Sequence, residues 1–425
     1  MVRFFLRVKS IFKVAWGRTP VQWLWRKPED ELDTLLLIAS KHYSPHWNSG
    51  FNVYIARVMY FAMLIFWPFR ALLLIATGMR KYARKAKHLR SIGYRKQLYD
   101  QLIIAFRYNA NPEIYYIFEL FTKRRLGQAR CFLLANITSA LVSYVNNYKS
   151  TDETEDKLHY SQMLREHGLS SIKDIAVINR YGISALNSDT NSAYDLPPID
   201  MIVKPNSGEQ ADGIIRLEWL GNGNYYCSNG NQYSKAEMHK YLQGLATNGQ
   251  HIIQPRLFNH SGIADLTTKG FSTCRIITGI TPTNDIEVVL AVFKMPTGES
   301  VVDNFSSGGI ASPVNISTAE LGVAVSMENI GIQYGRHPDT GAKITDRQLP
   351  FWPETLALVK SAHAITKGLV FLGWDVGITD DGPVILEANG RMGWSLAQRP
   401  SMQGLGSTRF SSICIQWDNS LRNKS

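Results

Sequence analysis

Three residues near the end of the chain have the types and spacing of a metal-binding site: Asp375, Glu387 and Asn389. They lie on two β-rich runs joined by Asp380-Asp381-Gly382, a sequence typical of a tight hairpin. If three residues close this hairpin, Asp375 lies opposite Glu387, and Asn389 shares the face of Glu387 because side chains alternate along a strand. Facing carboxylates repel each other unless a cation lies between them. Two carboxylates and an amide oxygen suit Mg²⁺ that also binds nucleotide phosphates, so the pattern predicts a magnesium site.

The alternative is an acidic hairpin whose charges point into water. It accounts for Asp380 and Asp381, which lie in the turn. It does not account for Glu387 and Asn389, which interrupt an otherwise apolar strand, where a buried acid needs a partner. We therefore favour the metal site.

A second candidate group could bind phosphates. Lys204 lies in a β-rich run, residues 201–205, and leads into a small flexible loop over residues 206–213 that contains Ser207 and Gly208. Such a loop lets backbone N–H groups approach phosphates while the lysine supplies a fixed cation. No Walker GxxxxGK[ST] and no dinucleotide GxGxxG motif is present, so those phosphate-binding folds are disfavoured.

Two further predicted strands carry basic residues. Residues 271–278 place Thr273 and Arg275 on one face, where the arginine could stabilise phosphoryl oxygens or form an ordinary ion pair. Residues 289–294 form the other strand and lead into a loop over residues 301–310 that can donate backbone hydrogen bonds. The candidate residues of this strand and loop are Lys294, Asn304, Gly308 and Gly309.

The composition indicates a folded protein in a reducing compartment. At 425 residues and 45% hydrophobic content, the chain is long enough for two or three domains with proper cores. Its four cysteines show neither a paired spacing nor a zinc pattern, so no disulfide framework is expected and the cytosol is the predicted location.

The charge is unevenly distributed. Residues 1–150 carry 24 Lys and Arg against 7 Asp and Glu, a net charge of +17, whereas residues 151–425 have a net charge of −6. This asymmetry indicates an anionic surface as partner, either a membrane or a nucleic acid.

The N-terminal part contains an apolar run beside a basic one. Residues 58–76 are apolar apart from Pro68 and Arg70 near the middle, which favours a bent hairpin or an in-plane amphipathic helix over a membrane span. The buried core of a small helical domain is the alternative. Residues 79–96 contain eight Arg and Lys and no acid, which suits the anionic cytoplasmic face of a membrane better than nucleic acid. We expect peripheral attachment there; residues 1–27, basic and aromatic, do not resemble a cleaved signal peptide.

Hydrophobic periodicity and capping residues predict the remaining elements. The acidic stretch around residues 150–157 is typical of a boundary between modules. The predicted helices are residues 28–42, stretches of 100–147, 157–168 and 352–369, and a further strand is predicted over 251–257.

These pieces resemble the ATP-grasp superfamily, in particular its bacterial branch of sugar-transfer-associated proteins, over about residues 110–400. The most specific segments are VDNFSSGGIASPV (302–314), HPDTG (337–341), LPFW (349–352) and LGWDVGITDDGPVILEANG (372–390). The Asp…Glu-x-Asn set is also similar to that of D-alanine D-alanine ligase and the ribosomal-protein glutamate ligase. The resemblance implies an α+β fold in which two subdomains hold ATP, here residues 151–250 and 251–425, after a helical, membrane-proximal module of residues 1–150.

The resemblance also implies roles for individual residues. Lys157 and Lys204 are similar to the phosphate-binding lysines, and Asp375, Glu387 and Asn389 to the Mg²⁺ ligands. The remaining implied nucleotide contacts are Ser207, Gly208, Gln254, Arg256, Leu257 and Thr273, with His260 or Asp265 as the ribose contact. The implied catalytic and substrate residues are Arg275, Lys294, Asn304, Gly308, Gly309, His337 and Arg391. Relatives often have Pro-Gly after the asparagine, whereas this chain has Gly390-Arg391, which places a cation where a substrate carboxylate or phosphate would lie.

The implied activity is an ATP- and Mg²⁺-dependent carboxylate–amine ligase that acts through an acyl phosphate in surface polysaccharide assembly. Its partners would be small-molecule or glycan acids and amines and an anionic membrane, with no nucleic acid. Two alternatives remain open: a kinase that phosphorylates a sugar hydroxyl, with Asp303 as base, and a membrane-bound scaffold with a degenerate ATP site.

Overall fold

The computed structural model describes residues 29–41, 51–108, 110–146, 152–186, 196–207, 213–298, 300, 305, 308–390 and 392–424. Five of the predictions above concern residues outside these ranges. They are the basic aromatic segment 1–27, the site residues Gly208, Asn304 and Arg391, and Asp303, the base of the alternative kinase.

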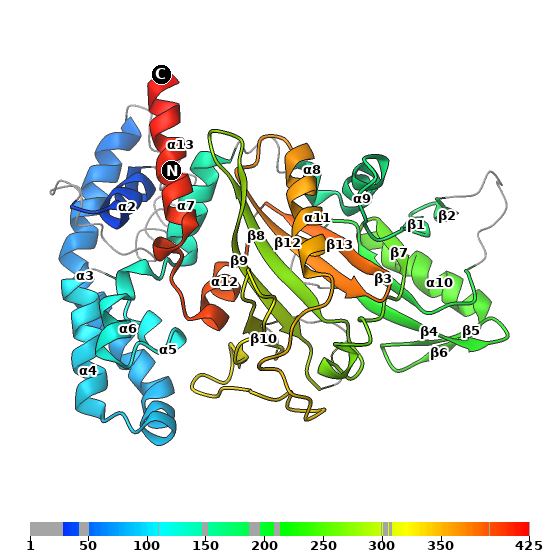
Figure 1. Cartoon of the computed structure of the whole chain (residues 1–425), viewed down its shortest axis with the longest axis horizontal. Helices are drawn as coiled ribbons and strands as arrows, with labels where there is room; N and C mark the ends of the chain where they lie inside the picture. Colours follow the sequence, from blue (N-terminus) through cyan, green and yellow to red (C-terminus); the bar gives the residue numbers. More distant parts are fainter. Residues whose placement is uncertain are drawn as a thin grey trace, which may run out of the picture.

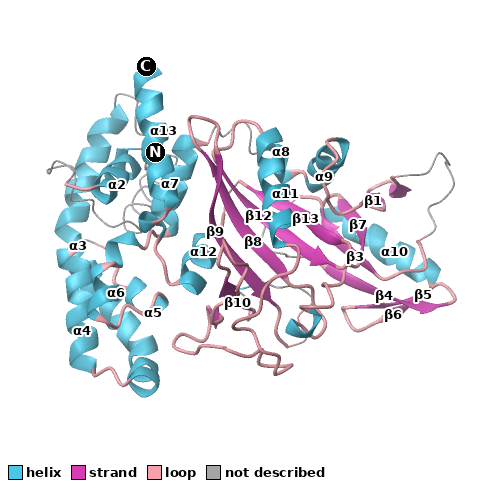
Figure 2. Cartoon of the chain, viewed as in Figure 1, coloured by secondary structure: helices cyan, strands magenta, loops and turns pink. Residues whose placement is uncertain are grey.

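Strands and helices are mixed along the chain, and the described strands form two antiparallel sheets (Figure 2). The first sheet has seven strands in the order β2-β1-β7-β3-β4-β5-β6. Its strands are β1 (Ala176–Asn179), β2 (Gly182–Ala185), β3 (Met201–Pro205), β4 (Ile215–Gly221), β5 (Asn224–Cys227), β6 (Gln232–Tyr233) and β7 (His251–Pro255). Helix α10 (Lys235–Leu245) buries Met238 and Leu242 against it.

The second sheet has six strands in the order β11-β10-β9-β8-β12-β13. Its strands are β8 (Thr273–Ile280), β9 (Ile286–Met295), β10 (Ile310–Pro313), β11 (Val325–Ser326), β12 (Phe371–Thr379) and β13 (Gly382–Asn389). The strands predicted over residues 201–205, 251–257, 271–278 and 289–294 are confirmed as β3, β7, β8 and β9.

Helices cover both faces of the six-stranded sheet, because its central strands are apolar on both sides. On one face, α9 (Lys157–Glu166) and α11 (Trp352–Ile365) bury Leu164 and Val359 against strand residues such as Trp374. The other face is covered by four helices, α2 (Glu31–Lys41), α7 (Ala135–Val145), α12 (Trp394–Ser401) and α13 (Arg409–Lys424). The core on this face therefore joins α2, near the start of the described residues, to α13 at their end, and both helices lie at the upper left of Figure 1.

The outer helices lie on the side of the molecule away from the seven-stranded sheet (Figure 1). The short helix α8 (Asp152–Glu155) follows α7 and is not one of them. The outer helices are α3 (Phe51–Arg90), α4 (Tyr94–Leu102), the π-helix η3 (Ile103–Arg107), α5 (Ile114–Ile117) and α6 (Lys123–Gly127). Together they form a helical region before the sheets, as predicted.

Helix α3 is continuous for 40 residues and contains Pro68, so the bent hairpin predicted over residues 58–76 is wrong. Proline removes one helical hydrogen bond, but Trp67, Ala71 and Ile75 are buried together with Ala105 of η3 and hold the helix on both sides of it. Among the described helices, none is long and apolar enough to cross a membrane.

Candidate functional site

The hairpin of β12 and β13 brings the three predicted metal ligands together. Asp375 pairs with Glu387 and Gly373 pairs with Asn389, so the predicted register is confirmed at these positions. The turn differs from the predicted three-residue loop, since Thr379 pairs with Gly382 across a two-residue turn. A bulge between Asp375 and Val376 then adds the residue that the shorter turn removes.

Three strands contribute a row of charged side chains, Arg275, Asp375 and Glu387, on the sheet face opposite α11, and β9 adds Lys294 beside it. Arg275 of β8 lies directly across from Asp375, and its Nε and Nη2 donate hydrogen bonds of 2.8 and 2.7 Å to the two carboxylate oxygens. Lys294 of β9 places its Nζ 3.0 Å from Asp375 Oδ1. Asn389 Nδ2 lies 3.3 Å from Glu387 Oε1 and 3.5 Å from Asp375 Oδ2. The side chains of Asp375, Arg275 and Lys294 are all largely buried.

The two carboxylates differ in their affinity for protons. Burial alone would raise the pKa of Asp375, but the cations of Arg275 and Lys294 hold that pKa well below its usual range. For Glu387, burial and then the charge of Asp375 raise the pKa, against the opposing charges of Lys204 and Lys157. Asp375 is therefore a firmly ionised member of the pair, whereas Glu387 needs an added cation to be equally stable as a carboxylate.

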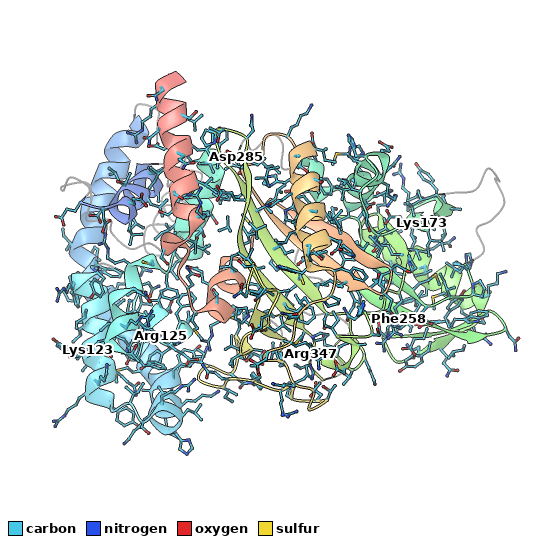
Figure 3. All side chains as sticks on the ribbon, in the orientation of Figure 1. Lys123, Arg125, Lys173, Phe258, Asp285 and Arg347 are labelled. Atoms are coloured by element: carbon cyan, nitrogen blue, oxygen red, sulfur yellow. The ribbon has the colours of Figure 1, made fainter. Side chains whose placement is uncertain are left out.

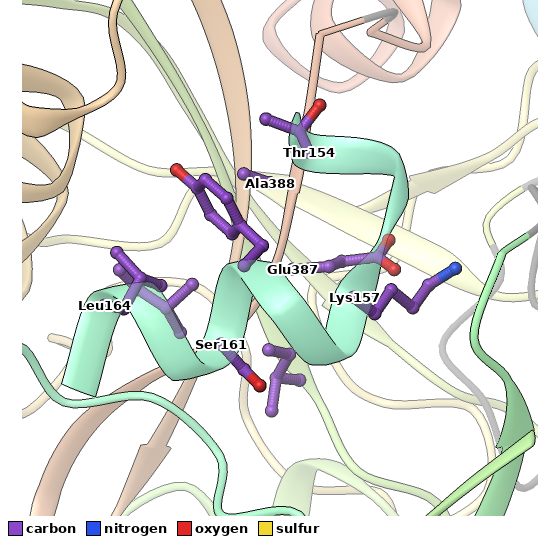
Figure 4. Close-up of a pocket in the computed structure, with 9 residues that line it drawn as sticks. Thr154, Lys157, Ser161, Leu164, Glu387 and Ala388 are labelled. Atoms are coloured by element: carbon purple, nitrogen blue, oxygen red, sulfur yellow. The ribbon is translucent and has the colours of Figure 1, made fainter. Parts of the chain in front are cut away.

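Two lysines come to this row from other elements. Lys204 of β3 is buried, and burial lowers its pKa while the charge of Glu387 opposes that shift. Lys157 begins α9 and lines a small cavity of about 10 Å³ together with Glu387 (Figure 4). The site thus has four cations, Lys157, Lys204, Arg275 and Lys294, around two carboxylates. This excess of positive charge suits a polyanion such as a nucleoside triphosphate.

Asn206 fixes the positions of both lysines. Its Oδ1 accepts a 2.9 Å hydrogen bond from Leu158 N, and its Nδ2 donates to Asp156 Oδ1 at 3.0 Å and to Gln250 Oε1 at 2.9 Å. Asp156 in turn caps α9 by accepting from His159 N at 2.9 Å. The start of α9, with Lys157, is thereby tied to the end of β3, with Lys204.

The sequence does not single out Asn206, because an asparagine after a strand is common in turns. It does contain a signal for Asp156, since aspartate is a favoured N-cap just before a helix.

The residues expected at the adenine hinge lie at the end of β7. Gln254 is buried, and its Nε2 donates a 2.7 Å hydrogen bond to Asp174 Oδ1. Arg256 contacts Asp200 at 3.0 Å and stacks 4.9 Å above the ring of Phe258. The side chains of Gln254 and Arg256, and the backbone N–H of Arg256, therefore bind protein groups in this structure. The remaining residues of this set are Leu257, half-buried, Ser207, exposed, and Thr273, buried beside Lys294.

The two candidates for the ribose contact both bind protein groups, His260 at the outer end of the hairpin and Asp265 between two loops. His260 N donates to Ile378 O at 2.8 Å, and Asp265 forms an ion pair with Arg347. The geometry favours neither as a nucleotide contact.

Three predicted substrate residues lie around the end of β9. Gly308 and Gly309 directly precede β10, in which Ala311 pairs with Lys294. His337 is buried, with its Nε2 3.0 Å from Pro296 O and its Nδ1 3.3 Å from Asp339 N. The two glycines therefore lie near the charge row, whereas His337 uses Nε2 to hold its loop to the end of β9 and Nδ1 to bind backbone within that loop.

The donor set fits a magnesium ion in its chemistry. Among the described residues, no three His, Cys, Asp or Glu side chains gather as a complete metal cage. Two carboxylates and an amide converge here, however, and Mg²⁺ prefers such a partial set of hard oxygens, with phosphate oxygens and water as its other ligands. Asn389 would turn its amide to present Oδ1 in place of the Nδ2 that now faces the carboxylates.

Comparisons with known proteins point to one family. The sequence model described as sugar-transfer associated ATP-grasp matches residues 136–414 of the chain. No curated protein matches the chain.

Three similar solved structures are a D-alanine–D-alanine ligase from Bacillus anthracis complexed with ATP, an L-amino acid ligase from Bacillus licheniformis, and an ADP complex of N5-carboxyaminoimidazole ribonucleotide synthetase. In that order, the sequence identities are 13, 12 and 13% and the TM-scores are 0.37, 0.35 and 0.35. The matches cover 66, 66 and 67% of this chain and 70, 53 and 59% of those chains.

Proposed function

The chain belongs to the sugar-transfer associated ATP-grasp family, and on that premise we propose that it is an ATP-dependent ligase that joins a carboxylate to an amine. The observation that carries this proposal is the row of Arg275, Asp375 and Glu387 with Lys294 beside it. An ionised, buried carboxylate holds these cations in place. They can therefore neutralise the charge that develops on a transferring phosphoryl group without having to move themselves.

The reaction proceeds in two steps. An oxygen of the acid substrate attacks the γ-phosphorus of ATP, and the bond to the bridging oxygen breaks to release ADP and leave an acyl phosphate. The amine then attacks the acyl carbon, loses a proton, and displaces phosphate to form the amide. No protein nucleophile is required, so the contribution of the chain is in-line positioning and charge neutralisation.

Each group of residues has one task in this scheme. Lys157 and Lys204 bind the ATP phosphates, and Arg275 and Lys294 face the phosphoryl group in transfer. Asp375, Glu387 and Asn389 hold Mg²⁺, which would supply positive charge to the phosphates. Asn304, Gly308, Gly309 and Arg391 bind the acid.

We propose surface polysaccharide assembly as the setting, with an amino acid and a sugar acid as the class of substrates, because the family is described as sugar-transfer associated. The enzyme would then work peripherally at the cytoplasmic face of the cell membrane.

A matched pair of variants tests the metal ligands. Glu387→Gln removes one carboxylate of the row and is expected to lower ATP turnover at least about 100-fold, since it removes charge stabilisation from the transition state. Asp381→Asn removes an exposed carboxylate from the turn of the same hairpin and is expected to leave turnover unchanged. Equal turnover in wild type and Glu387→Gln, measured as ADP release, would refute the assignment.

Hydroxylamine distinguishes the ligase from a sugar kinase. It intercepts an acyl phosphate and yields a hydroxamate, whereas a phosphate ester is inert to it. With ATP, Mg²⁺ and a panel of sugar acids and amino acids, the expected products are a hydroxamate, ADP and free phosphate. A stable phosphate ester on the acceptor, with no hydroxamate and no free phosphate, would replace the ligase by the kinase.

A further inference from the structure

The outer face of α3 exposes large apolar side chains in a regular helical row. The exposed fractions are 67% for Ile65, 69% for Phe69, 50% for Leu72 and 55% for Leu73. Soluble surfaces seldom group large apolar side chains in this way unless the group binds something. The row therefore needs a partner.

The same face becomes basic farther along the helix. Residues 65, 69, 73, 76, 80, 84 and 87 follow one another at steps of three and four, which places them on one side of a helix. The first four are apolar and the last three are Arg80, Arg84 and Lys87, all exposed. From residue 65 to the end of α3 at Arg90, the helix contains seven Lys and Arg and no Asp or Glu.

The opposite face of α3 packs against other helices of the protein. Trp67, Ala71 and Ile75 are buried among the outer helices, together with Ala105. Arg90 at the end of the helix binds the buried Glu119 at 3.0 Å. The rotation of α3 about its axis is thereby fixed, with the apolar and basic row exposed. Helix α3 lies on the left side of the molecule in Figure 1.

We propose that α3 lies in the plane of an anionic membrane surface, with Ile65, Phe69, Leu72 and Leu73 in the boundary between headgroups and acyl chains and with Arg80, Arg84 and Lys87 on lipid phosphates. The inference rests on the proposed location at a membrane and not on the ligase chemistry. An apolar row that continues into a basic one is the pattern of an interfacial helix.

The dimensions agree with this arrangement. The exposed apolar row from Ile65 to Ala76 is about 17 Å long at the helical rise of 1.5 Å per residue. That is about half of the 30 Å hydrocarbon thickness, so the row is too short to cross a bilayer but long enough to lie on one leaflet.

Charge favours a membrane over a second copy of the chain. A second copy laid along this row would bring Arg80, Arg84 and Lys87 against either its own basic residues or its apolar ones. An anionic leaflet offers apolar depth and negative charge over the whole length at once.

Binding of the full chain to vesicles tests the proposal. Flotation is measured with vesicles of phosphatidylcholine containing 30% phosphatidylglycerol and with pure phosphatidylcholine, at low and high salt. We expect binding to the anionic vesicles that weakens as salt rises, because the screening length falls to about 3 Å at 1 M. Absence of binding to anionic vesicles at low salt would overturn the proposal.

Two variants test the basic part and the apolar part of the α3 surface separately. Arg80→Gln/Arg84→Gln/Lys87→Gln is expected to weaken binding to anionic vesicles about 100-fold, from roughly fivefold per basic residue. Phe69→Ser/Leu73→Ser is expected to weaken it at least about 10-fold through lost apolar burial. Undiminished binding in both variants would place the attachment elsewhere in the chain and refute the role of α3.

Matched controls remove the same kinds of side chain from other faces. Lys173→Gln/Lys240→Gln/Lys367→Gln removes three exposed positive charges, and Figure 3 shows Lys173 at the far end of the molecule from Lys123 and Arg125 of the helical side. Tyr181→Ser/Leu220→Ser removes two exposed apolar side chains. Both controls are expected to bind as wild type does. Equal losses in controls and α3 variants would indicate adsorption by net charge or hydrophobicity alone and would overturn the proposal.

Two measurements distinguish membrane binding by α3 from a dimer formed through α3 and from the ligase reaction. A dimer that dissociates in Phe69→Ser/Leu73→Ser, with no vesicle binding, would show that a second copy covers α3. The Glu387→Gln protein should float with vesicles as wild type does, because the ligand row and α3 lie on different elements. Failure of the ligase reaction would thus leave vesicle binding intact, and failure of vesicle binding would leave ligase activity intact.

Discussion

Asp375 illustrates how one residue can serve both stability and chemistry. Its two oxygens bind Arg275 and Lys294, both on other strands, and it lies opposite Glu387 in the pair that we propose as metal ligands. Removing one partner from a buried ion pair is costly because the other charge stays behind. Asp375 should therefore contribute to folding as well as to catalysis.

Asp375→Asn is expected to lower the free energy of unfolding by about 3 kcal/mol, since Arg275 and Lys294 lose the carboxylate that neutralises them. The measurement is the midpoint of urea unfolding at neutral pH without nucleotide. Asp381→Asn, in the exposed turn of the same hairpin, is the control and should unfold like wild type. An unfolding midpoint of Asp375→Asn equal to that of wild type would contradict the structural role.

We expect Asn206 to act as a positioning residue, because its side chain ties the start of α9, with Lys157, to the end of β3, with Lys204. Asn206→Ala removes the side-chain hydrogen bonds between the start of α9 and β3 and leaves the backbone bond from Lys157 N to Asn206 O. It is expected to raise KM for ATP about tenfold, with a smaller change in kcat. Gln250→Ala removes only one of these bonds and leaves α9 tied to β3, so its KM should change much less. Similar KM values in wild type and Asn206→Ala would show that the lysines are positioned by other contacts.

The elements of the site are largely predictable from the sequence, for identifiable reasons. Strands β3, β7, β8 and β9 are short apolar runs with clear limits, and the pairing of Asp375 with Glu387 follows from the alternation of side chains. The turn length does not follow, because Asp-Asp-Gly is compatible with two or three residues and the compensating bulge has no local signal.

The contacts between distant elements are what the sequence does not provide. The ion pairs of Asp375 join β8, β9 and β12, and their partners become visible only when the strand order is known. Helix α3 shows the same limit: Pro68 suggests a break, but packing against η3 holds the helix through it.

A buried histidine links three elements behind the site. His363 of α11 lies 2.7 Å from Thr278 Oγ1 of β8 through Nδ1 and 3.0 Å from Leu369 O through Nε2, while Trp374 Nε1 of β12 donates to Thr278 Oγ1 at 2.7 Å. The neutral ring satisfies all of these bonds if Nε2 carries the proton. Burial lowers the pKa of His363 from 6.5 to about 4, so the folded protein keeps the neutral form.

The stability of the protein should therefore depend on pH through this residue. Between pH 6.5 and 4 the unfolded chain binds a proton at His363 and the folded protein does not, so stability falls as pH decreases, by about 3 kcal/mol in total. Above pH 6.5 the contribution is constant. In His363→Gln, the difference in unfolding free energy from wild type should shrink by this amount between pH 7 and 4, whereas His88→Gln, at an exposed position, should show a constant difference. A pH-independent difference for His363→Gln would contradict the assignment.

At the scale of the whole molecule, the N-terminal helices and the six-stranded sheet share one core. Leu35 of α2 and Leu141 of α7 pack in the same cluster as Phe371 of β12 and Phe410 of α13. Asn146, just after α7, accepts hydrogen bonds from Val370 N and Phe371 N at 2.8 and 3.0 Å. The change of composition near residue 150 therefore does not mark a boundary between separate cores.

Residues 152–425 produced alone should therefore fold poorly, because the sheet face covered by α2 and α7 would be exposed. The expected result is binding of a hydrophobic dye and loss of a cooperative thermal transition. Co-production with residues 29–146 should restore both properties towards those of the full chain. A fragment 152–425 that unfolds cooperatively and does not bind dye would show that the sheet is independent of these helices.

The charge row also has a consequence for how the sheet assembles. Arg275, Asp375 and Glu387 lie in one line across three strands, and neighbouring residues such as Trp374 and Val376 face the apolar core under α11. A slip of one residue between β8 and β12 would turn Asp375 into that core without its cations, at a cost of several kcal/mol. A sheet paired in the wrong register is therefore penalised by the same charged residues that we propose as the nucleotide and metal site.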